Sequence, residues 1–203
     1  MKKIGSKGFT LIELLAVITI MGILMMVAIP SVSRTIENAR RDTYANIAHE
    51  YLNAIRNNVL ADNIECEICS GLVTASALTD GFYYFEIDTT QQQTKDLMES
   101  GGKSPFGNAE MKGYVVWHKY TDNYGMDNQK TITKYYIKLV DSGRHGFDVF
   151  LSEDAIKRAN IFTSTTYGTD DIEPPTQWET LDASLPYDDQ PYVYSQPFEC
   201  ILS

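Results

Sequence analysis

The N-terminal part of the chain contains a continuous apolar run with one charged side chain. Between Phe9 and Ile29 that residue is Glu13, and the run holds no Lys or Arg. A helix of about 20 residues is roughly 30 Å long, which matches the hydrocarbon thickness of a bilayer. The run therefore predicts a helix that spans a membrane.

Apolar residues continue after this run, but on one side of the predicted helix. From residue 31 to residue 60 they recur every three or four positions, the spacing of an amphipathic helix. This stripe consists of Val32, Ile36, Tyr44, Ile47, Ala48, Tyr51, Leu52, Ile55 and Val59. Pro30 lies between the two patterns, where a proline either bends a continuing helix or marks its end.

The remaining residues have the composition of a small β-containing head. Residues 113–120 and 131–140 are rich in β-branched and aromatic side chains, and the stretch between them is typical of a hairpin loop. Residues 146–152 predict a third strand after a turn. The expected fold is α+β, with a long N-terminal helix packed on a small antiparallel sheet of about three to five strands.

Less regular structure is expected in the other parts of the head. Residues 61–112 are mixed in character, and we expect a mostly irregular connection with a short helix over 94–99. Residues 153–160 predict a helical turn. An irregular tail follows, with prolines at 174, 175, 186, 191 and 197.

Charge limits the possible partners. The formal net charge is −10, and residues 161–203 contain eight acidic residues with no Lys or Arg. Affinity for nucleic acid depends on clustered basic side chains that neutralise phosphates. We therefore expect no nucleic-acid partner and interpret the acidic tail as a solvated surface.

Two ordinary interpretations of the apolar run leave Glu13 unexplained. A secretory signal peptide would need a cleavage site, for which residues 31–33 are a weak match, and it would seldom carry an acid in its apolar region. A plain membrane anchor would pay roughly 3 kcal/mol for a carboxylate inside the bilayer. Lys2, Lys3 and Lys7 precede the run, so the N-terminus is expected in the cytoplasm and the residues after the span outside.

The stretch Gly8-Phe9-Thr10-Leu11-Ile12-Glu13-Leu14-Leu15 resembles the N-terminus of type IV prepilins and type II secretion pseudopilins. The resemblance covers residues 1 to about 60. It implies cleavage after Gly8 by a prepilin peptidase and N-methylation of Phe9. It also favours a kink at Pro30 within one long helix.

The resemblance implies that the chain consists of a leader at 1–8, a helix at 9–60 and an extracytoplasmic head at 61–203. The helix divides into a membrane-spanning or filament-core part at 9–29 and an amphipathic part at 31–60. The implied partners are other pilin subunits in a homo- or heteropolymer, the prepilin peptidase, an assembly platform and the membrane. The protein would first reside in the cell membrane and then in a filament on the cell surface.

Removal of the leader also explains Glu13 physically. It exposes an α-amine on Phe9, and in a filament a neighbouring subunit is displaced along the axis. Glu13 of one subunit can then neutralise the Phe9 amine of another, so each buried charge finds a partner on assembly.

The three cysteines suggest a bridge in the head. Thiols outside the cytoplasm tend to oxidise, and Cys66, Cys69 and Cys200 place a C-x-x-C pair far from a C-terminal cysteine. A bridge from Cys200 to Cys66 or Cys69 is one interpretation, and the resemblance favours it because type IV pilins often close a C-terminal loop this way. A Cys66–Cys69 bridge, a metal site and a redox C-x-x-C motif are the alternatives.

Catalytic signals are weak, and we expect neither an enzyme nor a cofactor. His49, His118 and His145 are scattered over different predicted elements, which suggests no nucleophile–base pair or metal site. The loop at 122–128 has a calcium-site composition without the ligand spacing of an EF-hand, so a solvated hairpin loop is the simpler interpretation. Aromatic residues that could bind a ligand are Trp117, Trp178, Tyr187, Tyr192 and Tyr194.

Three functional hypotheses remain. The protein is a structural pilin of a type IV filament, a pseudopilin of a secretion or DNA-uptake system, or a minor adhesive pilin whose head binds a carbohydrate or another surface ligand. The sequence does not rank them.

Overall fold

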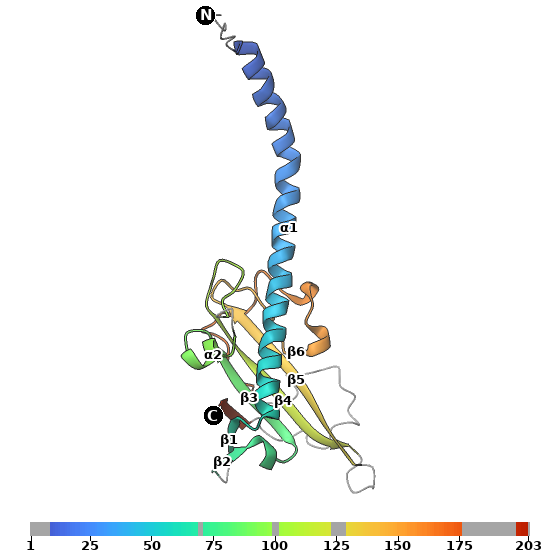
Figure 1. The fold of residues 1–203 in the computed structure, drawn as a ribbon, viewed down its shortest axis with the longest axis vertical. Coiled ribbons are helices and arrows are strands. Elements are labelled where there is room, and N and C mark those ends of the chain that lie inside the picture. The colour runs from blue at the N-terminus through green and yellow to red at the C-terminus, as the bar shows by residue number, and fades with distance from the viewer. Residues whose placement is uncertain (1–8, 69–70, 99–101, 123–128, 176–197, 203) are drawn as a thin grey trace, which may run out of the picture. The chain divides into compact units, whose positions relative to one another are not determined.

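The computed structural model of the protein describes residues 9–68, 71–98, 102–122, 129–175 and 198–202 (Figure 1). The chain divides into two compact units, one ending at Ala39 and the other starting at Arg40.

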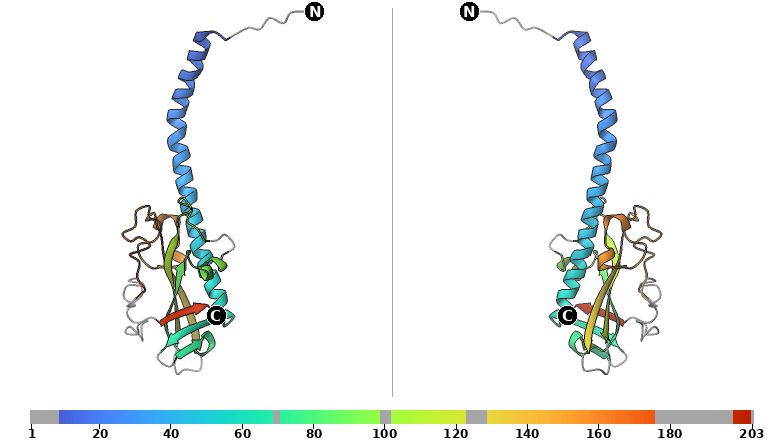
Figure 2. Two further views of the ribbon diagram at one scale, coloured as in Figure 1. Left: turned by 90° about the vertical axis from the view of Figure 1, so that its left-hand side faces the viewer. Right: turned by 90° about the vertical axis from the view of Figure 1, so that its right-hand side faces the viewer.

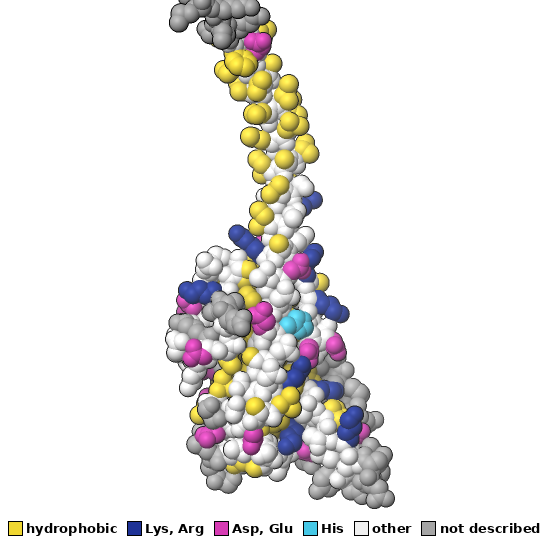
Figure 3. All heavy atoms as spheres, in the orientation of Figure 1, with side chains coloured by type: hydrophobic (Ala, Val, Ile, Leu, Met, Phe, Trp, Pro, Cys, Tyr) yellow, Lys and Arg dark blue, Asp and Glu magenta, His cyan; other side chains and the backbone are white. Residues whose placement is uncertain are grey.

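The first unit is the N-terminal part of helix α1, which runs from Leu11 to Leu60. The helix continues through Pro30 without an interruption. The large apolar side chains from Phe9 to Ile29 are exposed, and Figure 3 shows them covering this part of the helix. By length and composition α1 can cross a membrane. An apolar surface of this extent needs lipid or other protein around it.

In the second unit, residues 40–60 of α1 lie along one face of a β-sheet (Figure 2). The buried side chains of α1 are Tyr44, Ala45, Ile47, Ala48, Tyr51, Leu52, Ile55 and Val59. The predicted apolar stripe is therefore confirmed from Tyr44 onwards, whereas Val32 and Ile36 are exposed.

The sheet has seven strands in the order β2-β1-β7-β3-β4-β5-β6. Their bounds are Ile64–Ile68 for β1, Gly71–Thr74 for β2, Gly81–Asp88 for β3, Met111–Asp122 for β4, Lys130–Asp141 for β5, Leu151–Ser152 for β6 and Phe198–Leu202 for β7. Strands β3 and β7 are parallel, and the other neighbours are antiparallel. The C-terminal strand thus lies inside the sheet, between β1 and β3.

Side chains alternate between the two faces of the sheet, as the pleat of a strand requires. Trp117 and Ile137 belong to the main core with the buried residues of α1. Val116 and Tyr136 belong to a smaller cluster on the opposite face. Short helices connect the strands: η1 at Ala75–Ala77, α2 at Gln92–Asp96, η2 at Glu153–Ala155 and η3 at Arg158–Asn160.

Two ion pairs join α1 to the segment after β6. Arg158 pairs with Asp42, and its Nε donates to Oδ1 of Asp42 at 2.7 Å. Arg56 pairs with Glu153 and lies with its guanidinium 5.0 Å from the centre of the Tyr135 ring. These pairs are partly exposed, so they fix the position of the segment more than they stabilise the fold.

The α+β class and the packing of a long helix on the sheet are confirmed, and several details are corrected. Residues 61–112 are not mostly irregular, because they contain β1, β2 and β3. The sheet has seven strands and is mixed rather than purely antiparallel. Strand β1 is hard to predict because it pairs with β7, which lies more than a hundred positions further along the chain. Strand β3 pairs along its whole length with β4.

Smaller corrections concern the turns and the tail. The strand expected at 146–152 is reduced to β6 and an isolated bridge between Gly146 and Val140. The helix expected at 94–99 lies at Gln92–Asp96. Residues 176–197 of the predicted tail lie outside the described residues, and the tail ends in the regular strand β7.

Candidate functional site

The candidate site is the start of α1, where the sequence places the processing and assembly residues. Phe9 precedes the helix and is 89 % exposed. Gly8, the expected cleavage residue, lies outside the described residues. The new N-terminus that cleavage would create therefore lies two residues before the first helical residue, Leu11.

Thr10 and Glu13 form a reciprocal cap at this end of the helix. Oε2 of Glu13 accepts hydrogen bonds from the Thr10 backbone N–H and from the Thr10 hydroxyl, both at 2.8 Å. The Thr10 Oγ1 in turn accepts from the Glu13 backbone N–H at 3.3 Å. This is the capping box of a Thr followed three residues later by Glu, and it satisfies N–H groups that a helix start leaves free.

The cap gives Glu13 a local role that the charge argument alone did not identify. All three bonds use Oε2 or the backbone of Glu13, and none of them uses Oε1. One carboxylate oxygen is thus held by the subunit itself, and the other takes no part in the cap. The Thr-x-x-Glu spacing was visible in the sequence, so Thr10 could have been identified there.

The other polar side chain in the apolar run is satisfied within the helix. The Thr19 hydroxyl lies within hydrogen-bond distance of the carbonyls of Leu15 and Ala16, at 3.1 and 2.8 Å. A hydroxyl bonded in this way is accommodated in a membrane helix. Glu13 differs because it keeps a full carboxylate in an apolar segment.

The structure brings together Cys66 and Cys200, two of the three cysteines considered for a bridge. Cys66 and Cys200 lie opposite each other on β1 and β7 and form a disulfide across 134 positions of sequence. Cys69 lies outside the described residues. The bridge joins β7, at its middle residue, to the first strand after α1.

The histidines lie apart, on α1, on β4 and in the turn after β5. His118 stacks between the rings of Phe82 and Tyr120, with centroids 4.0 and 4.7 Å away. Burial, and secondarily the charge of Lys134, lowers the pKa of His118 to about 4. Its ring is therefore neutral at physiological pH and behaves as part of the aromatic cluster.

A buried polar group in the head was missed by the sequence argument. Asp141 is fully buried and accepts hydrogen bonds from the Ser104 hydroxyl at 2.5 Å and from the His145 backbone at 2.8 Å. The His145 ring also lies 3.0 Å from Asp141 and stacks on Phe106. The buried carboxylate of Asp141 thus holds together the loop that contains Ser104 and the turn that contains His145.

The other candidate ligands give no assembled site. The part of the chain that the structure describes contains no group of three or more His, Cys, Asp or Glu residues suited to a metal ion. Trp117 is buried in the core, and the aromatic residues at 178, 187, 192 and 194 lie outside the described ranges. Of the loop at 122–128, the structure describes Asp122 alone.

A family model described as the prokaryotic N-terminal methylation motif matches residues 4–29. The chain carries a pilin-type N-terminus. This motif is characteristic of type IV pilins and pseudopilins, and the helix-on-sheet head is arranged as in a pilin. The match spans the pilin-type N-terminus with Gly8, Phe9 and Glu13, and it ends one residue before Pro30. No curated protein and no solved structure matches the chain.

Proposed function

We propose that the protein is a structural subunit of a type IV pilus-like filament, processed after Gly8 and methylated on Phe9. The observation that carries the proposal is a carboxylate, Glu13, within an exposed apolar helix that also carries the methylation motif. Pilins and pseudopilins are structural proteins, and we assign no reaction to this chain.

In the proposed filament, Glu13 of one subunit binds the Phe9 amine of the next. Desolvating either charge alone is costly, whereas an ion pair in an apolar environment offsets much of that cost. The capping box supports this role because Thr10 holds Oε2 and leaves Oε1 for an incoming donor. A contact between different surfaces of successive subunits repeats as an open helical polymer.

The proposal includes the partners and the location of the protein. The precursor resides in the membrane with its basic N-terminus in the cytoplasm and its head outside. A prepilin peptidase removes residues 1–8 on the cytoplasmic side. An assembly platform then transfers it into a surface filament. The methylation motif supports a pseudopilin of a secretion or DNA-uptake system as the second candidate, because both classes share it.

The test is to purify surface filaments and determine the N-terminus of their subunit by mass spectrometry. A methylated Phe9 as the first residue is the expected result. A pseudopilin would instead remain with the envelope when surface filaments are sheared off. A surface-exposed chain that begins at Met1 or beyond Ser31 would exclude processing at Gly8.

The role of Glu13 is tested with Glu13→Ala as the only subunit. Cleavage and membrane insertion should continue, because the variant loses a costly charge, while filament yield should fall at least tenfold because the incoming amine meets no counter-charge. Glu50→Ala, which removes an exposed acid from the second half of α1, is the matched control and should assemble normally. Normal filaments from Glu13→Ala would show that the carboxylate has no part in docking.

A further inference from the structure

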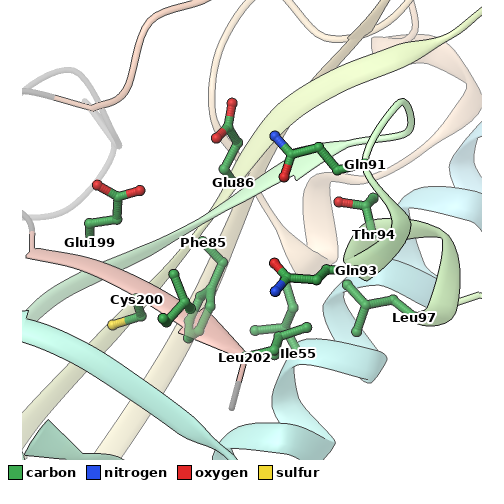
Figure 4. A pocket seen from close by; sticks show the side chains of 11 residues that line it. Ile55, Phe85, Glu86, Gln91, Gln93, Thr94, Leu97, Glu199, Cys200 and Leu202 are labelled. Atoms are coloured by element: carbon green, nitrogen blue, oxygen red, sulfur yellow. The ribbon is translucent and has the colours of Figure 1, made fainter. Parts of the chain in front are cut away.

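Two hollows of the head differ in size and in lining. The first lies between β3, β7 and α2, and its apolar walls come from Ile55, Phe85, Leu97 and Leu202 (Figure 4). Pockets that bind small molecules have volumes of about 300–1,000 Å³. The first hollow, of 160 Å³, is below this range, whereas the second, of 500 Å³, lies beside β5 and is within it. The second hollow is therefore the candidate for a binding surface.

This second hollow, here called the edge groove, runs along the backbone of a strand. Its lining includes four consecutive residues of β5, from Thr133 to Tyr136, and the residues from Ser152 to Asp154 at the end of β6 and the start of η2. Side chains of consecutive strand residues point to opposite faces of a sheet, so a hollow lined by four of them follows the edge of the strand.

The edge groove exists because β6 is short. Strand β6 pairs with two residues of β5, Tyr136 and Ile137, and the chain then enters η2 at Glu153. Strand β5 begins at Lys130 (Figure 1). Residues 130–135 of β5 thus extend beyond β6, with no strand on their outer side among the residues that the structure describes.

The backbone groups that face outwards belong to alternate residues of β5. The C=O of Leu139 accepts a hydrogen bond from the N–H of Phe147 at 2.9 Å, so it points away from β4. The pairing of β5 with β4 is in register along both strands, and backbone groups of alternate residues in a paired strand point to the same side. The N–H and C=O groups of Thr131, Thr133 and Tyr135 therefore also point away from β4, and they have no hydrogen-bond partner in the described part of the chain.

An edge of this kind binds another strand. Its unpaired N–H and C=O groups are a template for main-chain hydrogen bonds to an extended segment. The side chains of such a segment alternate between the two faces, and a groove that follows the edge gives space to both sets. The geometry of the edge groove therefore favours an extended peptide segment over a compact ligand.

Two lysines on this edge disfavour one occupant and select another. Lys130 and Lys134 lie on the same face of β5 with Ile132 between them, because residues two apart in a strand share a face. Antiparallel pairing of two copies of this edge about Ile132 would place Lys130 against Lys134, and like charges opposite each other are destabilising. On β4, Asp122 lies opposite Lys130, whereas the neutral His118 lies opposite Lys134.

Lys134 is the cation that an incoming strand would meet. It lies 5.7 Å from the centre of the Tyr120 ring and is paired with no carboxylate among the described residues. An acidic side chain on the incoming strand would neutralise it. An apolar side chain two positions away would contact Ile132, which is half-buried.

We propose that this edge of β5 binds an extended segment of a different protein and adds it to the sheet as a strand, with an acidic side chain opposite Lys134 and an apolar side chain opposite Ile132. The backbone supplies most of the contact, and Lys134 supplies the selectivity. The surface belongs to the head and is separate from Phe9 and Glu13, so the inference does not depend on how subunits pair in a filament.

The first experiment measures binding of a designed peptide to the full chain in detergent. The probe is an acetylated heptapeptide, Thr-Val-Thr-Glu-Thr-Val-Thr, with a fluorophore at its C-terminus, and fluorescence anisotropy follows binding. With Glu opposite Lys134, a Val faces Ile132 in either strand direction. A peptide with Lys in place of Glu should bind about tenfold more weakly, because like charges across an interface repel each other.

A charge swap tests the selectivity. Lys134→Glu should reverse the preference, so that the Lys peptide binds more tightly than the Glu peptide. Lys157→Glu makes the same change at an exposed lysine outside the edge groove, and it should keep the wild-type preference.

A proline tests the backbone contact. Thr133→Pro removes an outward N–H from an exposed edge position and should weaken binding of the Glu peptide about tenfold. Thr133→Val keeps that N–H and should bind as wild type does. The unfolding temperature of each variant shows whether its head is folded.

Hydrogen exchange provides a readout that needs no substitution. The segment 130–135 of the wild-type chain should exchange more slowly when the Glu peptide is bound. If Thr133→Pro does not fold, this measurement and the charge swap decide the question. Equal affinity of the wild-type chain for the two peptides, or unchanged exchange in this segment, would overturn the inference. Self-association of the wild-type chain that is lost in folded Thr133→Pro would make a second copy the occupant and would overturn it as well.

Discussion

Gly146 is a residue whose backbone leaves little room for a side chain. Its φ is +141°, a conformation that L residues rarely adopt, and an added Cβ would lie 2.1 Å from the carbonyl oxygen of Leu139. It would also lie 2.6 Å from the Tyr44 hydroxyl, which bonds to the same carbonyl. The turn after β5 and the helix approach so closely there that glycine is required.

We expect Gly146→Ala to destabilise the head by about 3 kcal/mol or more, because backbone strain and overpacking act together. Thermal unfolding of the full chain in detergent measures the loss. Gly107→Ala is the matched control, since Gly107 also has a positive φ of +90° but no atom within 4 Å of its added Cβ. Equal losses in the two variants would show that contact with Leu139 and Tyr44 has no part in the effect.

His118 makes stability depend on pH. Its pKa falls from an ordinary 6.5 to about 4 in the folded head, chiefly through burial, so the unfolded chain binds a proton that the folded chain does not. Stability should therefore decrease as the pH falls through this window, by about 2 kcal/mol between pH 6.5 and 5. Thermal unfolding of wild type and His118→Phe at pH 7 and 5 tests this expectation.

The phenylalanine retains a ring between Phe82 and Tyr120 but takes up no proton, so its loss of stability on acidification should be smaller. His49→Gln removes a histidine from α1 and should keep the wild-type dependence. A His118→Phe chain that loses as much stability as wild type would assign the acid sensitivity to other groups.

At the scale of elements, a helix or hairpin with a local sequence pattern could be predicted, whereas strand pairing between distant segments could not. The hairpin of β4 and β5 was predicted because each strand is long and rich in Val, Ile and Tyr. The buried half of α1 was predicted because Tyr44, Tyr51 and Ile55 recur at helical spacing. Strand β1 was missed because its short, mixed sequence becomes a strand through pairing with β2 and the distant β7. Strand β3 pairs with β4 along its whole length, and its aromatic residues 82–85 were a strand signal that the prediction did not use.

In the candidate site, too, residues of one local motif could be named from the sequence, whereas contacts between distant segments could not. Roles for Gly8, Phe9 and Glu13 could be predicted because all three belong to one contiguous stretch, and Thr10 was missed although its spacing to Glu13 is a capping signal. Asp141 was missed because its partner Ser104 comes from a distant loop.

The disulfide between β1 and β7 is expected to stabilise the head. Closing a loop across 134 positions is worth about 4 to 5 kcal/mol in the chain-entropy model. Cys200→Ser should therefore lower the unfolding temperature and make β7 accessible to protease. Cys69→Ser should leave both properties unchanged, and the opposite ranking of the two variants would place the bridge elsewhere.

At the scale of the whole molecule, the distribution of basic residues predicts how the precursor is oriented. In a Gly8→Leu precursor that the peptidase cannot cut, trypsin added to intact spheroplasts should cleave after Arg34 or Arg40. The N-terminal fragment should keep uncut bonds after Lys2, Lys3 and Lys7, because the positive-inside rule predicts that these residues lie on the cytoplasmic side. Mass spectrometry of the membrane fraction detects that fragment, and permeabilised cells provide the control in which the lysines are cut.

Cleavage after the lysines in intact spheroplasts would reverse the orientation. That result would also conflict with a cytoplasmic peptidase site at Gly8.

The position of β7 determines what a truncated subunit would expose. Strand β7 fills the space between β1 and β3, so a chain truncated before Phe198 leaves two strand edges without hydrogen-bond partners. Open edges of this kind are sites of aggregation and of attack by proteases. A chain truncated just before β7 would thus yield a subunit prone to degradation, although helix α1 is complete.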